Sequence, residues 1–353
     1  MPLAVLSAMR EATREHITVK GGKYLETAAA ADTIVFDKTG TLTHACPKVV
    51  KVIPFRNYQE SDMLRLAACL EEHFPHSMAN AVVEAARKQG LSHEEIHSKV
   101  EYIVAHGIVS MVNEERVLIG SAHFIFEDEK IRIPAFQQER FERLPEEYSH
   151  LYLAIGEELA AVICISDPLR EEAKNVLAAL HELGIRKTVM LTGDSERVAS
   201  MAASHLGIDT YCAEVLPADK AEFIRKLRKQ GNTVLMVGDG MNDSPALSEA
   251  DVGIAINEGA AIAREVADIT ISGESLWELV KLRQIAAALM KRIHSNYRFI
   301  IGFNGILIGM GLTGLLSPAA SAALHNLSTL GVSLRSMTAL PILKLESQDK
   351  LCE

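Results

Sequence analysis

Residues 33–43 read T-I-V-F-D-K-T-G-T-L-T, an apolar and β-branched run that ends at Asp37 and then turns polar. Such a run before a carboxylate predicts a buried strand that presents Asp37 at its carboxyl end. Ligands of open α/β sheets bind outside the carboxyl ends of the strands. An aspartate placed there can attack a phosphoryl group and carry it as an aspartyl-phosphate. The stretch therefore predicts an α/β fold with Asp37 as a nucleophile.

Two later apolar runs end in the same way. Residues 188–191 lead into Thr192-Gly193-Asp194, and residues 233–237 lead into the stretch G-D-G-M-N-D at 238–243. Between them, Pro217 opens a predicted helix that has Lys220 in its first turn. Alone, each stretch is an ordinary helix cap or turn. Their succession at strand ends favours a single site.

These stretches, in this order, resemble the P-type ATPases of the heavy-metal-transporting branch. The matching residues are D-K-T-G-T-L-T at 37–43, T-G-D at 192–194 and G-D-G-M-N-D at 238–243, supported by D-P-L-R at 167–170 and D-V-G-I-A at 251–255. The resemblance covers essentially the whole chain but only the second half of the family's length. The chain therefore looks like a truncated or split transporter subunit that lacks the actuator domain and the earlier transmembrane helices, or like an internal start within a longer gene.

The resemblance implies a haloacid-dehalogenase-like fold, ATP and Mg²⁺ as cofactors, and a role for each matching residue. A transferring phosphoryl group is stabilised by hydrogen-bond donors and cations around its oxygens. The implied catalytic residues are Asp37, Lys38, Thr39, Thr192, Gly193, Asp194 and Lys220. Magnesium takes carboxylate oxygens, substrate phosphate and water. The implied magnesium ligands are Asp37, the Thr39 carbonyl and Asp239, with Asp243 and Asn242 in support.

A nucleotide site is also implied by the resemblance. His76 occupies the place of the histidine that lies on adenine in this branch, and Gly107 and Gly120 occupy the places of glycines near the nucleotide. Three positions depart from the pattern of the branch: Ser77 replaces a proline, Ala105 a glycine and Ser121 an asparagine.

The chain length and the spacing of the motifs predict several domains. Asp37 and Thr192 are 155 residues apart, too far for a simple crossover between strands, so an α+β domain is inserted. We divide the chain into a membrane-exit segment (1–29), a phosphorylation domain in two pieces (30–43 and 167–273), a nucleotide-binding domain (44–166), a helical connector with two transmembrane helices (274–340) and a C-terminal tail (341–353). Helices are expected at 61–72, 78–88, 171–184, 195–206 and 219–230. Strands of the insertion are expected at 99–105, 108–113, 116–120, 150–156 and 159–166.

Residues 299–334 contain no Asp, Glu, Lys or Arg, and Ser317-Pro318 divides them into two segments. Each segment has about the length that spans a bilayer. Lys or Arg residues flank the run on both sides, which predicts a transmembrane hairpin with both ends cytoplasmic. A multi-pass protein of the inner or plasma membrane, in contact with lipid and with cytoplasmic catalytic domains, is the expected arrangement.

Polar residues within this run are candidates for the transported ion. His325, Ser328 and Thr329 have the spacing of one helix face. Asn326 is adjacent, and Asn304 lies on the preceding helix. The histidine-containing stretch resembles divalent-metal pumps of the family, and imidazole with oxygen ligands suits Zn²⁺ or Cd²⁺ better than Cu⁺. Hydrogen bonds between helices are the ordinary alternative for the Asn, Ser and Thr side chains.

Other features exclude competing functions. The formal net charge is −10 and no Lys/Arg cluster stands out, which argues against nucleic acid as a partner. The five cysteines have no metal-ligand spacing. The H-E-E-I-H stretch at 93–97 matches a zinc-protease pattern but lies in polar surroundings after a predicted helix cap. Ser272-Gly273-Glu274-Ser275 resembles the dephosphorylation loop of the family, yet it opens a helix and is interpreted as a cap.

Two alternatives remain open at this point. A haloacid-dehalogenase-like phosphatase would carry a second aspartate two residues after the nucleophile as general acid and base. Thr39 fills that place here, which argues against a phosphatase. A non-catalytic partner of a half-transporter is disfavoured by the intact motifs.

Overall fold

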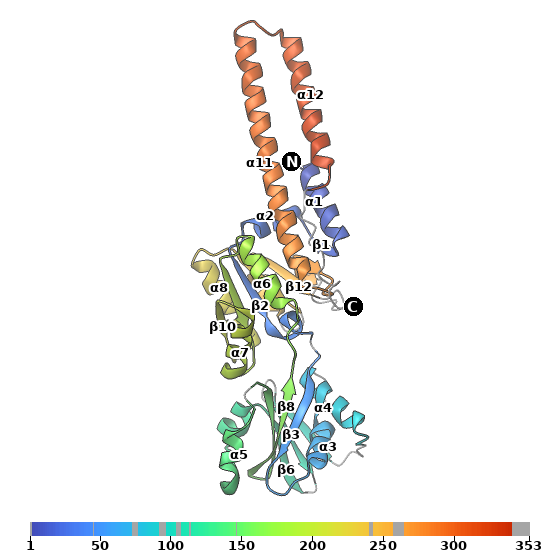
Figure 1. Ribbon diagram of the computed structural model, residues 1–353, viewed down its shortest axis with the longest axis vertical. Coiled ribbons are helices and arrows are strands. Elements are labelled where there is room, and N and C mark those ends of the chain that lie inside the picture. Colours follow the sequence, from blue (N-terminus) through green and yellow to red (C-terminus); the bar gives the residue numbers. More distant parts are fainter. Residues whose placement is uncertain are drawn as a thin grey trace.

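The protein, described here from a computed structural model, consists of three bodies stacked along its long axis (Figure 1). A helical hairpin stands at one end, a domain built on a parallel sheet lies in the middle, and an antiparallel domain forms the other end. The described residues are 2–44, 46–72, 77–91, 97–103, 107–112, 114–145, 147–239, 243–256 and 265–340.

The central sheet has seven strands. In spatial order they are β1 (Ile17–Val19), β13 (Ile269–Ile271), β12 (Val252–Ile256), β11 (Val234–Gly238), β2 (Thr33–Asp37), β9 (Lys187–Leu191) and β10 (Thr210–Cys212). All neighbours are parallel except β1 and β13. Every residue of β2, β11 and β12 is buried, as expected for strands that are covered on both faces.

Helices cover both faces of this sheet. They are α2 (Gly22–Ala30), α6 (Ala173–Glu182), α7 (Glu196–Leu206), α8 (Pro217–Lys229) and α9 (Ser244–Glu249). Successive side chains of a strand point to opposite faces, so Ile34 and Phe36 join one core with α2, α6 and α7. Val35 joins a second core with α8 and α9. The doubly wound α/β fold expected from the sequence is confirmed.

The inserted domain is a six-stranded antiparallel sheet with helical segments on both faces. The strand order is β3 (Lys48–Pro54), β8 (Glu158–Ser166), β7 (Ser149–Ile155), β6 (Glu115–Gly120), β5 (Gly107–Val112) and β4 (His97–Ile103). One face is covered by α3 (Glu60–Glu71) and α4 (Ser77–Lys88), and the other by η2 (His123–Asp128) and α5 (Gln138–Glu142), while the short η3 (Ala135–Gln137) buries no residue. The helices and the five strands that the sequence predicts for this domain are present. β3 is a sixth strand that the sequence analysis did not predict.

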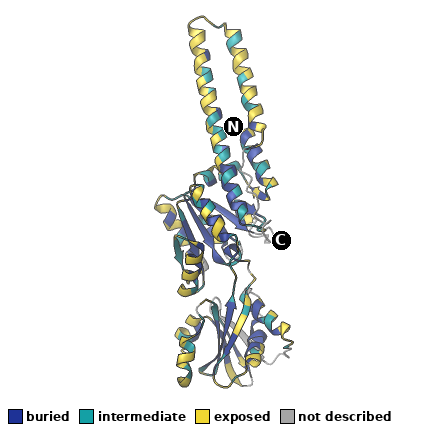
Figure 2. Cartoon of the chain, viewed as in Figure 1, coloured by how far each residue is buried: buried dark blue, intermediate teal, exposed yellow. Residues whose placement is uncertain are grey.

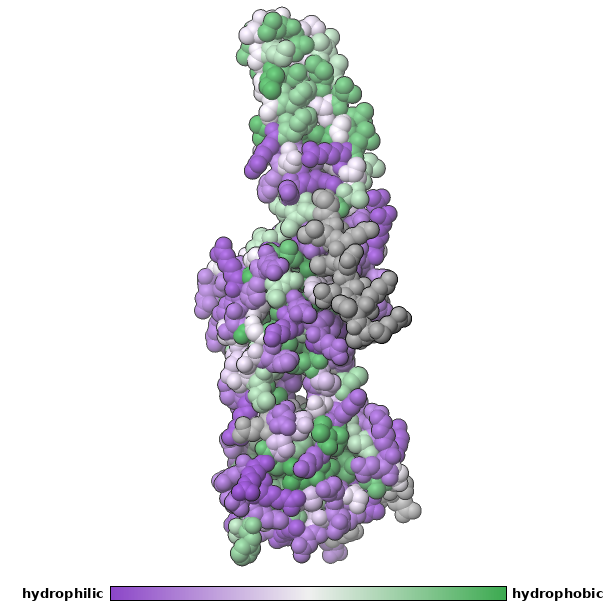
Figure 3. All heavy atoms as spheres, in the orientation of Figure 1, coloured by the Kyte–Doolittle hydropathy of each residue, from purple (hydrophilic) through white to green (hydrophobic). Residues whose placement is uncertain are grey.

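The hairpin consists of α11 (Trp277–Leu312) and α12 (Pro318–Met337). Many of its side chains are exposed (Figure 2) and apolar (Figure 3). Over the described residues, no helix combines the length and the apolar character that crossing a membrane requires. The expectation of two transmembrane helices is therefore not supported. The physical reason is that α11 ends at Leu312, which shortens its uncharged part, and α12 carries His325 and Asn326 in its middle.

The N-terminal residues fold onto the rest of the protein, although the sequence suggested a separate segment as far as residue 29. Helix α1 (Pro2–Arg14) buries Ala4, Ala8 and Ala12 in the same core as α11. β1 then extends the central sheet by pairing with β13. Three residues are too few to produce a recognisable strand pattern, so β1 could not be predicted from the sequence.

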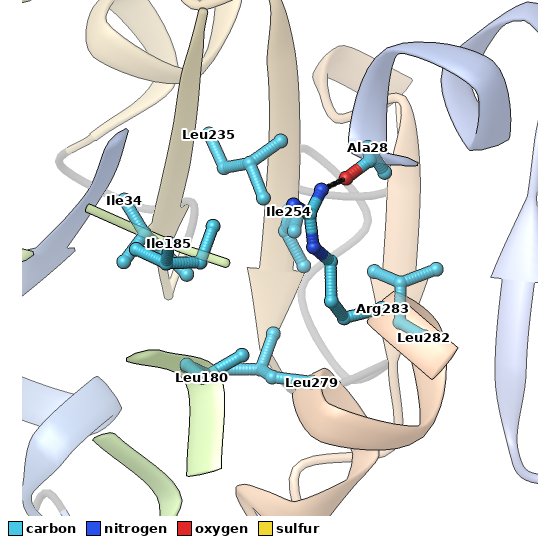
Figure 4. A pocket seen from close by; sticks show the side chains of 9 residues that line it. All are labelled: Ala28, Ile34, Leu180, Ile185, Leu235, Ile254, Leu279, Leu282 and Arg283. Carbon is cyan, nitrogen blue, oxygen red and sulfur yellow. Dashed lines mark hydrogen bonds between the residues drawn. The ribbon is translucent and has the colours of Figure 1, made fainter. Parts of the chain in front are cut away.

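Arg283 ties the long helix α11 to the central domain (Figure 4). Its guanidinium donates hydrogen bonds to the carbonyl oxygen of Ala28 near the end of α2 and to that of Leu183 just after α6 (3.2 Å). The last carbonyl groups of a helix lack partners within the helix, and a cation near them also complements the helix dipole. The side chain is 7% exposed and borders a small apolar pocket with Ile34 and Leu279. One buried arginine thus supplies hydrogen bonds to carbonyl oxygens at the ends of two helices and anchors the hairpin.

Candidate active site

Asp37 lies at the carboxyl end of β2, next to the ends of β9 and β11. The chain leaves it in a tight turn over Lys38–Leu42, in which Gly40 has a φ of +76°. Glycine suits this left-handed conformation because it has no Cβ. The Gly40 N–H donates to Thr43 Oγ1 (2.9 Å), which fixes the turn. The strand and turn together hold Asp37 at the edge where the other motifs also end.

Lys220 joins two buried carboxylates. Its ammonium donates to Asp37 Oδ1 at 2.5 Å and to Asp243 Oδ1 at 2.8 Å. Asp37, Lys220 and Asp243 are 6%, 7% and 1% exposed. Burial lowers the pKa of Lys220, but the charges of the two carboxylates outweigh it, and the net shift is upward. The lysine therefore remains a cation in the interior of the site.

The electrostatic environment of Asp37 is unfavourable to its charged form. Burial and then the nearby charge of Asp243 raise the pKa of Asp37 to about 7, although Lys220 acts in the opposite direction. Asp239 adds a smaller upward effect. Several carboxylates thus share one lysine, which leaves an excess of negative charge that another cation would offset.

A second ion pair stands beside the first. Lys38 Nζ lies 2.5 Å from Asp194 Oδ2, and the two side chains are 5% and 16% exposed. The same carboxylate oxygen accepts a hydrogen bond from Thr192 Oγ1 (2.8 Å). Burial raises the pKa of Asp194. Lys38 and the hydrogen bonds from Thr192 and Ser149 lower this pKa by more than burial raises it, so the net shift is downward. Asp194 is therefore an ionised group that orients Lys38 and Thr192.

The carboxylates of this site fit a magnesium ion. Asp243 Oδ2 is buried and has no hydrogen-bond partner among the described residues. Gly238 leaves room for it, because a Cβ at Gly238 would lie 2.6 Å from that oxygen. No group of three or more His, Cys, Asp or Glu side chains in the described part of the chain is gathered to hold a metal. Magnesium is satisfied by one or two carboxylates with phosphate and water, so the arrangement suits it.

The structure brings most of the predicted catalytic residues together. Asp37, Lys220 and Asp243 form one cluster, and Lys38, Thr192 and Asp194 form the neighbouring one. The remaining predicted residues Thr39, Gly193 and Asp239 follow the ends of β2, β9 and β11. Asn242 lies outside the described residues.

The structure describes only some of the predicted nucleotide-binding residues. His76 and Ala105 lie outside the described residues, whereas Gly107 and Gly120 face each other across β5 and β6. A Cβ at Gly107 would lie 2.4 Å from Cδ1 of Phe124, so close packing is one reason for glycine here. Ser121, one of the departures from the family pattern, accepts a hydrogen bond from the Phe124 N–H (3.3 Å).

The polar residues of the hairpin form local hydrogen bonds. His325 Nδ1 and Asn304 Oδ1 lie 2.9 Å apart across the two helices, in hydrogen-bond contact. The hydroxyl groups of Ser328 and Thr329 donate to the His325 carbonyl oxygen at 2.8 and 3.0 Å. Asn326 is exposed. The structure therefore joins His325 and Asn304, while the two hydroxyl groups are occupied within α12.

Of the two other motifs noted in the sequence, the structure describes the loop at 272–275 in full. Residues 93–96 of the zinc-protease pattern lie outside the described residues. The loop 272–275 hydrogen-bonds to the first turn of α11. Ser275 Oγ accepts from the Trp277 N–H (3.3 Å), and the Glu278 carboxylate accepts from Ser272 Oγ and the Gly273 N–H. These contacts support the interpretation of this loop as a cap.

Sequence reasoning did not assign roles to the residues that connect the two domains. Thr43 Oγ1 donates to Asp167 Oδ2 (2.7 Å), and Arg170 donates through Nε to the Thr43 carbonyl oxygen (3.2 Å). Asp167 and Arg170 belong to the D-P-L-R stretch, so its match to the family was an available signal. Ser149 donates to Asp194 Oδ1 (2.9 Å), and nothing in the sequence singled it out.

Comparison with known proteins is consistent with this geometry. A family model described as haloacid dehalogenase-like hydrolase matches residues 31–251. A zinc-exporting P-type ATPase of Mycobacterium marinum is 38% identical over 94% of this chain and 45% of its own length. A manganese-exporting P-type ATPase of Mycobacterium bovis is 37% identical over 94% of this chain and 46% of its own length.

The match extends to solved structures. A zinc-transporting PIB-type ATPase in its E2.Pi state has a TM-score of 0.70 and 32% identity, covering 95% of this chain and 54% of that one. Copper exporters match as well, and that of Bacillus subtilis is 33% identical over 95% of this chain and 42% of its own length. The chain spans about half the length of the curated relatives it matches.

Asp37→Asn is expected to flatten the pH dependence of stability in EDTA. Because the pKa of Asp37 is raised to about 7 in the fold, the folded state binds a proton that the unfolded state has lost. The contribution of Asp37 to stability is therefore fully present below about pH 4 and falls, by at most about 1.4 kcal/mol per pH unit, as the pH rises to about 7. The variant lacks this titration and should lose less stability over that interval.

Urea unfolding between pH 5 and 8, followed by the fluorescence of Trp277, measures this effect. Trp277 is the single tryptophan and packs against the core of the central domain. Asp219→Asn, an exposed carboxylate on α8, is the matched control. Parallel pH profiles for the wild type and Asp37→Asn would contradict the electrostatic description of the site.

Proposed function

The chain belongs to the haloacid dehalogenase-like hydrolase family, and from this premise we propose that it is the catalytic part of an ATP-driven transition-metal exporter that works through an aspartyl-phosphate on Asp37. The observation that carries the proposal is the buried triplet of Asp37, Lys220 and Asp243 at the carboxyl edge of the parallel sheet. Its relatives are named as exporters of zinc, manganese and copper, which supports a metal as the cargo.

In the proposed reaction, a carboxylate oxygen of Asp37 forms a bond to the γ-phosphorus of ATP. The bond from that phosphorus to the β–γ bridging oxygen breaks, and ADP leaves with the electron pair. Lys220 holds Asp37 Oδ1, which limits the rotation of the nucleophile. Lys38 and Thr192, both held by Asp194, lie beside the nucleophile and are suited to donate to phosphoryl oxygens.

Magnesium is the cofactor that this site suits. Asp37, the Thr39 carbonyl and Asp239 would hold it, with Asp243 in support and its unpartnered Oδ2 available. When bound, the ion supplies positive charge that offsets the carboxylates and the phosphates. The pKa of Asp37 is raised by burial and then by the negative charge of Asp243, so a cation in the site favours the ionised nucleophile.

The aspartyl-phosphate should persist once formed. A phosphatase of this fold needs a second carboxylate two residues after the nucleophile to activate water. Thr39 stands there and carries no base. Persistence suits an exporter, in which a separate event has to control hydrolysis.

The inserted domain is proposed to bind ATP through His76, Gly107 and Gly120. The closeness of Gly107 and Gly120 across β5 and β6 supports a shared location. Both linkers return to the phosphorylation site, since Thr43 and Asp167 bond to each other next to the turn that follows Asp37. The domain is therefore attached where it can deliver a nucleotide to Asp37.

The hairpin is proposed to lie in the inner or plasma membrane, among helices of the part of the exporter that this chain does not match. Ile301, Ile306, Ile308 and Leu327 are all more than half exposed, and an uncovered apolar surface of this kind marks an interaction site. Lipid and the remaining helices are the partners that such a surface fits. The catalytic domains would then be cytoplasmic.

The cargo is proposed to be a divalent transition metal, Zn²⁺ or Cd²⁺ first. His325 and Asn304 are held 2.9 Å apart and offer a nitrogen and an oxygen ligand. Asn326, Ser328 and Thr329 follow His325 on α12 and complete the proposed set. Imidazole with oxygen ligands suits Zn²⁺ better than Cu⁺, which prefers sulfur.

ATP radiolabelled on its γ-phosphate, with Mg²⁺, should label the chain on Asp37. The label should be stable in acid and released by hydroxylamine, as expected for an acyl phosphate. Asp37→Asn and Asp37→Ala should abolish it. Asp219→Asn, at an exposed carboxylate of the same domain, should retain it. Labelling that survives in the Asp37 variants would overturn the assignment.

His325→Ala should reduce the stimulation of phosphoenzyme formation by Zn²⁺ at least about tenfold in a reconstituted transporter, because the imidazole is the strongest ligand of the proposed set. Ser333→Ala, about two turns away on α12, is the control. Stimulation that is greatest with Cu⁺, or that is unchanged by His325→Ala, would refute the proposed cargo.

A further inference from the structure

Ser149 stands at the edge of the inserted domain that faces the phosphorylation site. It is the first residue of β7, where it pairs with Ile165 near the end of β8. β3 begins at the same edge, because Lys48 pairs with Ser166. Both linkers therefore leave the domain beside Ser149, and Figure 1 shows them as two neighbouring segments, one blue and one green, between the two bodies.

The hydroxyl of Ser149 reaches a residue of the other domain. Ser149 Oγ donates to Asp194 Oδ1 at 2.9 Å. The other oxygen of that carboxylate is held by Lys38 (2.5 Å) and Thr192 (2.8 Å). A continuous set of hydrogen bonds thus leads from the inserted domain to Lys38, the residue directly after Asp37.

This bond is a second attachment point in addition to the linkers. The linkers are joined at one place, where Thr43 contacts Asp167 and Arg170. A domain held at a single point can rotate about it, whereas a second contact at a distance in sequence fixes its orientation. The Asp194 side chain is only 16% exposed, so this hydrogen bond is partly protected from water.

We propose that Ser149 is a positioning residue for phosphoryl transfer: it fixes the inserted domain against the phosphorylation domain and holds Asp194 in the orientation that places Lys38 and Thr192. The inference rests on the proposed function, because it concerns the rate at which Asp37 is phosphorylated. Ser149 acts through Asp194 and does not touch the reacting atoms.

Removing the hydroxyl should therefore slow the transfer without weakening nucleotide binding. Without Ser149 Oγ, the contacts of the Asp194 carboxylate with described residues are those of its Oδ2, and the group can turn about its Cβ–Cγ bond. The contacts that Lys38 and Thr192 make with this carboxylate then lose their fixed orientation, although Thr192 Oγ1 also accepts from the Asp194 N–H (3.1 Å). A hydrogen bond to a charged group corresponds to a rate loss of about tenfold.

The test measures two quantities for the full chain. The first is the rate of phosphoenzyme formation at saturating ATP and Mg²⁺, and the second is the affinity for a non-hydrolysable ATP analogue by calorimetry. Ser149→Ala should lower the rate about tenfold and leave the affinity within about twofold. Ser149→Thr retains the hydroxyl and should recover most of the rate. Ser166→Ala, at the same edge of the domain, should match the wild type.

Each measurement has an outcome that would contradict the inference. An unchanged rate in Ser149→Ala, an equal loss in Ser166→Ala, or a loss of affinity in place of rate would overturn the positioning role. A wild-type chain that is not labelled on Asp37 would instead overturn the proposed function. The two failures are therefore distinguishable.

Discussion

The structure of the site depends on one buried lysine that lies between two buried carboxylates. Lys220 bonds to Asp37 and Asp243, and all three side chains are less than a tenth exposed. Removing one member of such a group would leave an uncompensated charge in the interior, which costs several kcal/mol. The arrangement is incomplete as it stands, since two carboxylates exceed one ammonium. Burial first, and then this excess of negative charge, raise the pKa of Asp37, and a further cation would offset the excess.

The fold supplies this cluster from three separate parts of the chain. Asp37 follows β2, Lys220 lies in the first turns of α8, and Asp243 precedes α9 after β11. Parallel strands bring their carboxyl ends to one edge, and burial of each strand on both faces fixes that edge rigidly. Gly238 matters here because any larger residue would displace Asp243. Arg283 performs a corresponding role further away, where it anchors the hairpin to the same domain.

The sequence was sufficient to predict the parallel sheet and most of the site, because apolar runs followed by Asp37, Thr192 and Asp239 are local patterns. It could not predict β1, which is three residues long and exists only because β13 accepts it. It also could not predict the contact between Ser149 and Asp194, since a lone serine has no pattern and the contact depends on how two domains meet. The prediction of two helices in the hairpin was correct. The structure does not show the membrane-spanning length, because uncharged residues continue past the end of α11.

The central claim is that Asp37 accepts a phosphoryl group while Lys220 holds its carboxylate and magnesium balances the charge. A crystal structure of the chain soaked with Mg²⁺ and beryllium fluoride, a mimic of a bound phosphoryl group, tests it most directly. The account predicts a beryllium fluoride adduct on Asp37, with Lys38, Thr192 or Lys220 donating to its fluorine atoms and the metal next to Asp239. An unmodified Asp37, with the adduct absent or on another carboxylate, would contradict it.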